Sequence, residues 1–234
     1  MLLVERGLFE SRTRAQAAIA AGLVTADGAR LKKASDEVAD SAELQASSEH
    51  PWVSRGGVKL AAALDHFGFE VAGHVCLDVG ASTGGFTEVL LTRGGICVYA
   101  VDVGRGQLHA RLREDKRIVS LEATDIRTLD PTALAPVPDF ATIDVSFISL
   151  KLVLPALDRL LRQPAHLIAL IKPQFEAGPK HVKKGIVRDL AMHEAVCEEI
   201  AVLASTLGWA VVGIIPSPIQ GGEGNKEFLM NASR

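Results

Sequence analysis

A glycine-rich turn between an apolar run and a helix-like segment constrains this chain most strongly. The run from His74 to Val79 is apolar around Asp78, and the turn G-A-S-T-G-G follows it, beginning at Gly80. Glycines let the backbone approach a ligand closely, and the N-terminus of the next helix offers unpaired N–H groups. A strand, a tight turn and a helix in this order are typical of a nucleotide-binding site in an α/β sheet.

The spacing within the turn narrows the choice of cofactor. It does not follow the G-x-G-x-x-G pattern of dinucleotide sites, and no Lys-Ser or Lys-Thr pair follows it as in a P-loop. A second apolar run ends in Asp102, about 20 residues past Gly80, where an acid meets a ribose hydroxyl. S-adenosylmethionine is the nucleotide-like cofactor that remains. A purely structural glycine turn is the alternative, since short glycine patterns have many false positives.

These residues resemble the first three motifs of the Rossmann-like methyltransferases. By that resemblance, Asp78, Asp102 and Asp125 correspond to contacts with the methionine amine, the ribose and the adenine. The resemblance implies cofactor contacts from the turn and from strand ends: Asp78, Gly80, Ser82, Gly84, Gly85, Phe86, Asp102, Asp125 and Asp144.

Strand-like and helix-like segments alternate through the rest of the chain, which predicts an α/β fold with a parallel sheet and helices on both faces. We expect strands over 74–79, 97–102, 118–121, 140–144, 167–171 and 209–215, and helices over 54–67, 86–93, 108–112, 152–161 and 190–207. A seventh strand over 227–230 should lie antiparallel at the edge, as in the seven-stranded Rossmann-like methyltransferase sheet.

The N-terminal residues have a different pattern. Two short helices are expected, ending near Gly7 and Gly22, followed by a hairpin over 23–25 and 30–32. Its turn is Asp27-Gly28, a pair that tolerates the positive φ values of a type I′ turn. A further strand is expected over 43–45.

Charge is also uneven along this part of the chain. The whole chain has a formal net charge of −3, which provides no bulk attraction to nucleic acid. Residues 1–33, however, hold six basic and three acidic residues, whereas residues 34–50 hold five acidic residues and no Lys or Arg. This asymmetry indicates a local basic face.

The segment S-R-T-R-A-Q-A-A-I-A-A-G-L-V-T-A-D-G resembles the alpha-L RNA-binding domain, whose helix and hairpin hold the RNA backbone. The resemblance implies a small α+β RNA-binding domain with five basic contacts: Arg6, Arg12, Arg14, Lys32 and Lys33. An amphipathic helical cap with solvated arginines is the alternative. We expect this domain over residues 1–46, a polar linker over 47–53 and the catalytic domain over 54–234.

Composition excludes several other classes of protein. Three widely spaced cysteines indicate buried thiols in a reducing compartment rather than a disulfide framework. The nearest approach to a zinc motif, H-E-A-V-C from His193, lacks the second histidine, so we expect no metal. No apolar stretch reaches the ~18 residues of a membrane helix. We therefore expect a cytoplasmic protein without stable membrane insertion, and nothing implies a protein partner.

Four charged residues stand out near the strand ends, where open α/β sheets bind ligands. They are Lys59 in the segment before the first strand, Asp144 and Lys172 at the ends of two strands, and Glu227 on the last strand. A lysine that ends an apolar strand is poorly explained by packing, because lysine is rarely buried unless it is paired. A structural ion pair between Lys172 and Asp144 is the alternative.

In order and context these residues resemble the Lys-Asp-Lys-Glu tetrad of the FtsJ-like ribose 2′-O-methyltransferases. With the N-terminal segment included, the chain resembles the TlyA haemolysin-A family, through the blocks S-R-G-G-V-K-L, L-D-V-G-A-S-T-G-G-F-T, D-V-S-F-I-S-L, L-I-K-P-Q-F-E and K-K-G-I-V-R-D. The resemblance implies S-adenosylmethionine-dependent methylation of the ribose 2′-OH of cytidine in the ribosomal RNA of both subunits. It implies ribosomal RNA or ribosomal subunits as the partner.

The residues favour a hydroxyl acceptor independently. An enzyme of this fold that methylates an amine would carry an Asn/Asp-Pro-Pro-aromatic segment after the fourth strand, and this chain has D-V-S-F there. The hydroxyl proton must leave, and Lys172 accepts it only when neutral, which burial or a nearby cation such as Lys59 favours. Asp144 would orient Lys172 and stabilise the charge that it gains.

Two alternatives come from other classes of protein. The family name records haemolysis, which raises a membrane-active protein, although the helical pattern argues against it. The other is an RNA-binding protein with an inactive methyltransferase fold. An inactive site has no need of both lysines, so the tetrad argues against this alternative.

Overall fold

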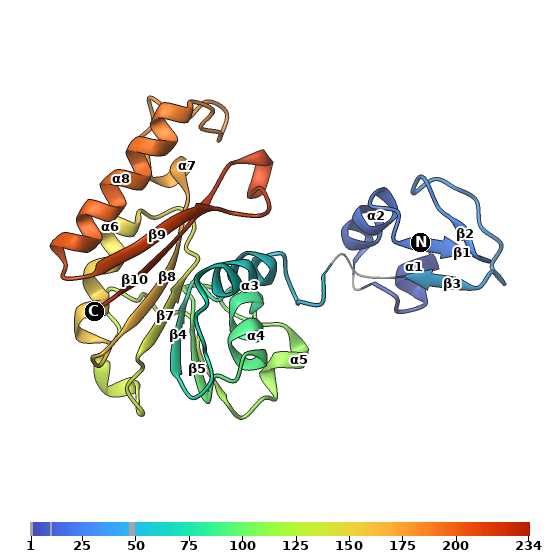
Figure 1. Cartoon of the computed structure of the whole chain (residues 1–234). Helices are drawn as coiled ribbons and strands as arrows, with labels where there is room; N and C mark the ends of the chain where they lie inside the picture. The colour runs from blue at the N-terminus through green and yellow to red at the C-terminus, as the bar shows by residue number, and fades with distance from the viewer. Residues whose placement is uncertain (1, 10, 47–49) are drawn as a thin grey trace. The chain divides into compact units, whose positions relative to one another are not determined.

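A computed structural model describes residues 2–9, 11–46 and 50–234 (Figure 1). The chain divides into two compact units, Met1–Pro51 and Trp52–Arg234. The expected linker over 47–53 falls partly on residues 47–49, which lie outside the described residues.

The first unit has two helices, α1 (Leu2–Glu5) and α2 (Arg12–Ala20), and a small antiparallel sheet of order β2-β1-β3. Its strands are β1 (Val24–Ala26), β2 (Ala29–Arg30) and β3 (Leu44–Ala46). The predicted hairpin turn is confirmed, with φ 50° at Asp27 and 78° at Gly28. Both strands reach closer to the turn than predicted, because Ala26 pairs with Ala29 directly across it.

The second unit is built on a seven-stranded sheet of order β6-β5-β4-β7-β8-β10-β9. Its strands are β4 (Val75–Val79), β5 (Cys97–Val101), β6 (Ile118–Leu121), β7 (Phe140–Ile143), β8 (His166–Ile171), β9 (Ala210–Pro216) and β10 (Phe228–Ser233). Its helices are α3 (Gly56–Phe67), α4 (Gly85–Thr92), α5 (Ala110–Arg113), α6 (Leu150–Val153), α7 (Pro173–Glu176) and α8 (Leu190–Thr206). The predicted α/β architecture is therefore confirmed.

The edge position predicted for the last strand is wrong. Strand β10 pairs antiparallel with both β8 and β9, so it lies inside the sheet and β9 forms the edge. The burial of the two strands explains the order: Leu229–Ala232 is buried, whereas β9 alternates exposed and partly buried residues. This burial is what the strand order produces, because a strand between two neighbours is covered more completely than a strand at the edge.

The predicted helix over 152–161 is also replaced by two shorter elements. Helix α6 ends at Val153 and a 3₁₀ helix follows over Leu154–Arg159. Pro155 lies at the start of that second element, and proline has no N–H to continue an α-helical hydrogen-bond ladder.

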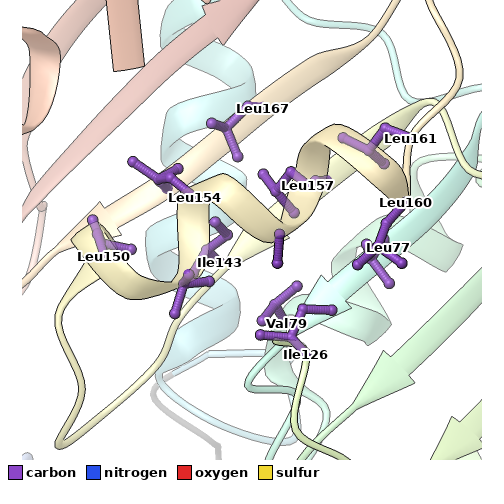
Figure 2. Close-up of a cluster of buried hydrophobic side chains, with 14 of the residues drawn as sticks. Leu77, Val79, Ile126, Ile143, Leu150, Leu154, Leu157, Leu160, Leu161 and Leu167 are labelled. Atoms are coloured by element: carbon purple, nitrogen blue, oxygen red, sulfur yellow. The ribbon is translucent and has the colours of Figure 1, made fainter. Parts of the chain in front are cut away.

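Successive strand residues point to opposite faces of the sheet and form two cores. On one face, Leu77, Ile143 and Leu167 pack against the 150–161 segment and α8; we call this the α8-side core (Figure 2). On the other face, Cys76 and Ile168 pack with Leu60 of α3 and with α4; we call this the α3-side core. The same alternation determines on which face of the sheet each polar residue of the site lies.

Candidate active site

The glycine turn after β4 is pressed against the ends of two neighbouring strands. The N–H groups of Gly80 and Ala81 donate to the carbonyl of Val101, at 2.9 and 3.1 Å, which ties the turn to the end of β5. Gly80 has φ 85°, and a Cβ there would lie 2.5 Å from the backbone oxygen of Asp144. Only glycine fits this position, because both the backbone angle and the space exclude a side chain.

Asp102 is held in one orientation at the end of β5. Its carboxylate accepts the backbone N–H of Ser82 at 2.8 Å and that of Gly104 at 2.7 Å. Ser82 itself has φ 48°, a sparsely populated conformation for a residue other than glycine. The acid is thus fixed about where a ribose hydroxyl meets it in related folds.

A cleft of about 790 Å³ opens beside the turn and Asp102. Its size falls within the range of small-molecule cofactor sites. Five of the predicted cofactor residues line it: Gly80, Ser82, Asp102, Asp125 and Asp144. Apolar side chains from Ile126, Phe147, Ile148 and Leu152 line the remaining wall.

Asp125 enters the cleft as one half of an ion pair. Its Oδ2 lies 2.6 Å from an Nη of Arg127, which also lines the cleft. Hydrogen bonds from the Arg127 side chain and backbone lower the pKa of Asp125 below its ordinary value. The carboxylate is therefore ionised near neutral pH and can accept a hydrogen bond from a ligand.

Three predicted cofactor residues serve to pack the turn and do not line the cleft. A Cβ on Gly84 would lie 2.4 Å from Leu112, and a Cβ on Gly85 would lie 2.1 Å from the Ser54 hydroxyl. Phe86 is buried in the α3-side core. These residues bring the start of α4 close to its neighbours, which holds the turn in place.

Asp78 does not line the cleft, and its expected contact with the methionine amine stays a prediction. Strand alternation turns it to the α3 side, where its carboxylate accepts hydrogen bonds from the hydroxyls of Thr87 at 2.6 Å and Thr142 at 3.0 Å. It is fully buried, and burial raises its pKa to about 7. Asp78 therefore links β4, β7 and α4 beneath the turn.

The structure brings Lys172 and Asp144 together at the carboxyl ends of β8 and β7. Lys172 Nζ lies 2.5 Å from Asp144 Oδ1 and donates to the Ser146 hydroxyl at 2.9 Å. The lysine is only 8% exposed, yet both of its partners line the cleft. A buried amine therefore lies directly behind the cleft wall.

Lys59 and Glu227 form a second ion pair, and both residues are buried. Helix α3 carries Lys59 next to Leu60, and Glu227 directly precedes β10. Phe228 pairs with Ile171, so Glu227 and Lys172 are the next positions along this antiparallel pair of strands. The four predicted residues are therefore joined as two ion pairs on the α3 side of one sheet edge.

Three further residues belong to this site and were not predicted from sequence. Gln174 donates to Glu227 across 3.5 Å and lies two residues past Lys172. Ser146 bonds Lys172, and Phe147 is 92% exposed with φ 64° at the cleft wall. The only sequence signal for them was their position within the D-V-S-F and K-P-Q-F-E segments.

The basic residues of the first unit differ in their surroundings. Arg6 donates to the carbonyl of Ala42 at 2.5 Å and to that of Asp40, so its guanidinium fastens α1 to the chain before β3. Lys32 and Lys33 are exposed, and only their backbone N–H groups contact Asp36. Of the other two predicted contacts, Arg12 is exposed and Arg14 belongs to α2.

Two features of the described residues bear on the other classes of protein. No group of His, Cys, Asp and Glu side chains there is arranged to hold a metal ion. None of the helices in that part of the chain is both long enough and apolar enough to cross a membrane.

The buried acid yields a prediction about stability. Its folded pKa of about 7 lies above the ordinary value of about 3.9, so protonated Asp78 stabilises the fold at low pH and this contribution is lost as pH rises from about 4 to 7. Asp78→Asn keeps the shape but cannot ionise. The free energy of unfolding of the wild type should fall relative to that of the variant across this range, in urea titrations at several pH values. Parallel curves would show that Asp78 does not titrate there.

Comparison with known proteins agrees with this architecture. Residues 52–234 match the FtsJ-like methyltransferase family and residues 1–44 match the S4 domain. The 16S/23S rRNA (cytidine-2′-O)-methyltransferase TlyA of Mycobacterium tuberculosis is 46% identical over 231 residues, which cover 97% of this chain and 86% of that protein.

Solved structures give the same result. A structure assigned as a hemolysin from Streptococcus thermophilus matches with a TM-score of 0.81 and 45% identity, over 100% of this chain and 86% of the other. A Burkholderia thailandensis N1-methyltransferase, solved with S-adenosylhomocysteine, shares the fold at a TM-score of 0.54 and 20% identity, over 77% of each chain. With a family match over the whole second unit and close relatives along nearly all its length, the chain belongs to the FtsJ-like methyltransferase family.

Proposed function

We propose that this protein transfers the methyl group of S-adenosylmethionine to the ribose 2′-hydroxyl of cytidine in ribosomal RNA. The observation that carries the proposal is the buried Lys172–Asp144 pair behind the cofactor-sized cleft. The 46% identity to a protein named as an rRNA (cytidine-2′-O)-methyltransferase supports the same acceptor. Ribosomal RNA as the substrate also favours the cytoplasm as the compartment.

The cleft residues fit a nucleoside cofactor. Asp102, fixed by two backbone N–H groups, is suited to accept hydrogen bonds from ribose hydroxyls. Asp125 is ionised beside Arg127 and can accept a hydrogen bond from an adenine amino group. Once bound, S-adenosylmethionine supplies an electrophilic methyl group. The protein must then hold the acceptor oxygen in line with that methyl and remove the acceptor proton.

Lys172 is the residue that we assign to proton removal. S-adenosylmethionine held beside Asp102 and Asp125 would supply the methyl group that the 2′-oxygen accepts, and its sulfur would keep the electron pair of the carbon–sulfur bond. The hydroxyl proton passes to the lone pair of neutral Lys172 Nζ, which becomes an ammonium. Asp144, 2.5 Å away, stabilises that new positive charge. Each group thus acts where charge develops in the transition state.

We propose a role for Lys59 that differs from the role expected from the sequence. As a neighbouring cation it was expected to favour the neutral form of Lys172, but its charge is directly opposed by Glu227. We assign this buried pair to positioning the end of β10 and α3 around the acceptor. Gln174 extends the pair toward the segment that follows Lys172.

The rim of the cleft favours a nucleotide as the acceptor. Phe147 is almost fully exposed, and its ring centroid lies 5.2 Å from that of Phe175. Exposed aromatic rings provide stacking surfaces for nucleobases, worth about 1–3 kcal/mol per base. Phe147 lies in the segment after β7 and Phe175 in the segment after β8. A base stacked on these rings would therefore bring its ribose toward Lys172.

We further propose that residues 1–46 bind RNA, residues 47–53 form a linker and residues 54–234 carry out methyl transfer. The match of residues 1–44 to the S4 domain and the exposed Arg12, Lys32 and Lys33 support the first part. The membrane-active alternative is favoured by the hemolysin names of one relative and two similar structures, whereas no helix of the described residues could cross a membrane.

The cofactor site is tested at Asp102. The change Asp102→Ala should weaken S-adenosylmethionine binding by about 10-fold or more, because hydrogen bonds to a charged acceptor contribute about 1.5–3 kcal/mol. Isothermal titration calorimetry measures this directly. Asp115→Ala, which removes an acid paired only with Arg117, is the control. Equal affinities of wild type and Asp102→Ala would place the cofactor elsewhere.

The base is tested at Lys172. Lys172→Ala should lower the rate of methyl transfer by about 10²–10⁴-fold with cofactor binding retained, and Lys172→Arg should fail as well, because arginine keeps its proton. The assay is 2′-O-methylation of ribosomal RNA with radiolabelled cofactor. Lys151→Ala, which breaks the exposed pair with Glu199, is the matched control. Near wild-type transfer by the arginine variant would assign this position to charge alone.

The RNA-binding face is tested by comparing lysines with Arg6. The double change Lys32→Ala and Lys33→Ala should weaken RNA binding and flatten its salt dependence, since each lost phosphate contact reduces the slope by about one. Thermal stability should not change. Arg6→Ala should instead destabilise the first unit, because two backbone carbonyls lose their donor. Unchanged RNA affinity in the double variant would move the RNA-binding face elsewhere.

A further inference from the structure

The two contacts of Lys172 Nζ define how a neutral amine is oriented there. A neutral lysine has two N–H donors and one lone pair, whereas an ammonium has three N–H donors. Nζ contacts Asp144 Oδ1 at 2.5 Å and Ser146 Oγ at 2.9 Å. The side chain is largely enclosed, and the ring of Phe175 lies 5.9 Å away from Nζ.

We propose that Ser146 is a positioning residue that turns the lone pair of neutral Lys172 toward the acceptor hydroxyl. This inference rests on the proposed function. Ser146 accepts one N–H hydrogen bond and Asp144 Oδ1 lies in ion-pair contact with Nζ, so the lone pair is the direction left for a substrate proton. Asp144 alone would leave Nζ free to rotate about its last carbon–nitrogen bond, so the lone pair would face the acceptor only part of the time.

Both partners of Nζ come from one short segment of backbone. Asp144 directly follows β7, and Ser146 comes two residues later. The chain then turns sharply at Phe147, where φ is 64°. Asp144 and Ser146 therefore reach Nζ from the same stretch of chain, which also lines the cleft.

The same contact matters after the proton has moved. When the 2′-oxygen has bonded to the methyl carbon and the carbon–sulfur pair has stayed on sulfur, Nζ carries three N–H bonds and a positive charge. Hydrogen bonds from a charged donor are about twice as strong as neutral ones. Ser146 thus stabilises the product form of the base as well as orienting its reactant form, without itself gaining or losing a proton.

Ser146 is exposed, so its substitution tests the hydrogen bond to Lys172 without disturbing the packing of the fold. Its side chain adds no packing to either core, so removal of the hydroxyl leaves no cavity. We would compare Ser146→Ala and Ser146→Thr with wild type in methyl transfer to ribosomal subunits, measured as kcat and KM from about pH 6 to 10. Ser205→Ala, an exposed serine whose hydroxyl bonds the Ala201 carbonyl within α8, is the matched control.

In Ser146→Ala we expect kcat to fall about fivefold to tenfold, the value of one lost hydrogen bond, while KM for RNA and thermal stability stay at wild-type values. The rising limb of the rate–pH profile should move to lower pH, because the lost acceptor stabilised the charged amine more than the neutral one. Ser146→Thr should restore both, since it keeps the hydroxyl, and Ser205→Ala should match wild type.

A wild-type kcat and pH profile in Ser146→Ala would overturn the inference. A fall in kcat with an unmoved pH profile and no rescue by threonine would also overturn it, because it would assign Ser146 a structural role only. Absence of transfer by the wild-type protein to any ribose 2′-hydroxyl would be a separate failure, of the proposed function itself.

Discussion

The close approach of the turn after β4 to the end of β7 is the contact on which the site depends. The backbone oxygen of Asp144 occupies the space where a side chain at Gly80 would be, and Asp144 N–H donates to the carbonyl of Val79 at 2.9 Å. The cleft wall and the ion-paired acid are therefore parts of one rigid backbone arrangement. Movement of the turn would change the cleft and displace the acid that is paired with Lys172.

Two ion pairs in which three of the four side chains are buried are unusual, because desolvation of charged groups opposes burial. They persist here because each lysine has an acid at contact distance, and because Ser146 and Gln174 add hydrogen bonds to the two pairs. Removal of one member of a buried pair costs about 3–5 kcal/mol, since the other charge is left without a partner. These two ion pairs are therefore held in place more firmly than the exposed ion pairs of this protein, which contribute little to the free energy of unfolding.

Sequence reasoning located the strand ends and hence most of the site. Asp144 and Lys172 were predicted to lie together because parallel strands end at a common edge, and they do. The pairing of Lys59 with Glu227 was not predicted. It depends on the position of β10 between β8 and β9, which involves strands far apart in the sequence.

The surroundings of two other predicted site residues differ in how far the sequence indicates them. The inward face of Asp78 was available from strand alternation, because Leu77 and Val79 both point to the α8-side core. The anchoring role of Arg6 had no sequence signal, because its acceptors are backbone carbonyls 34 and 36 residues away. Any residue type at those positions would provide the same acceptors, so no pattern in the sequence marks them.

The interior position of β10 has a consequence for the order in which this protein is made. Residues 228–233 follow both β8 and β9 along the chain, yet they fill the gap between these strands, and Glu227 enters the site with them. Until β10 has been made, β8 lacks that neighbour and Lys59 lacks its partner. A nascent chain can therefore pair β4 to β8 early, but it cannot assemble the charged centre before β10 has been synthesised.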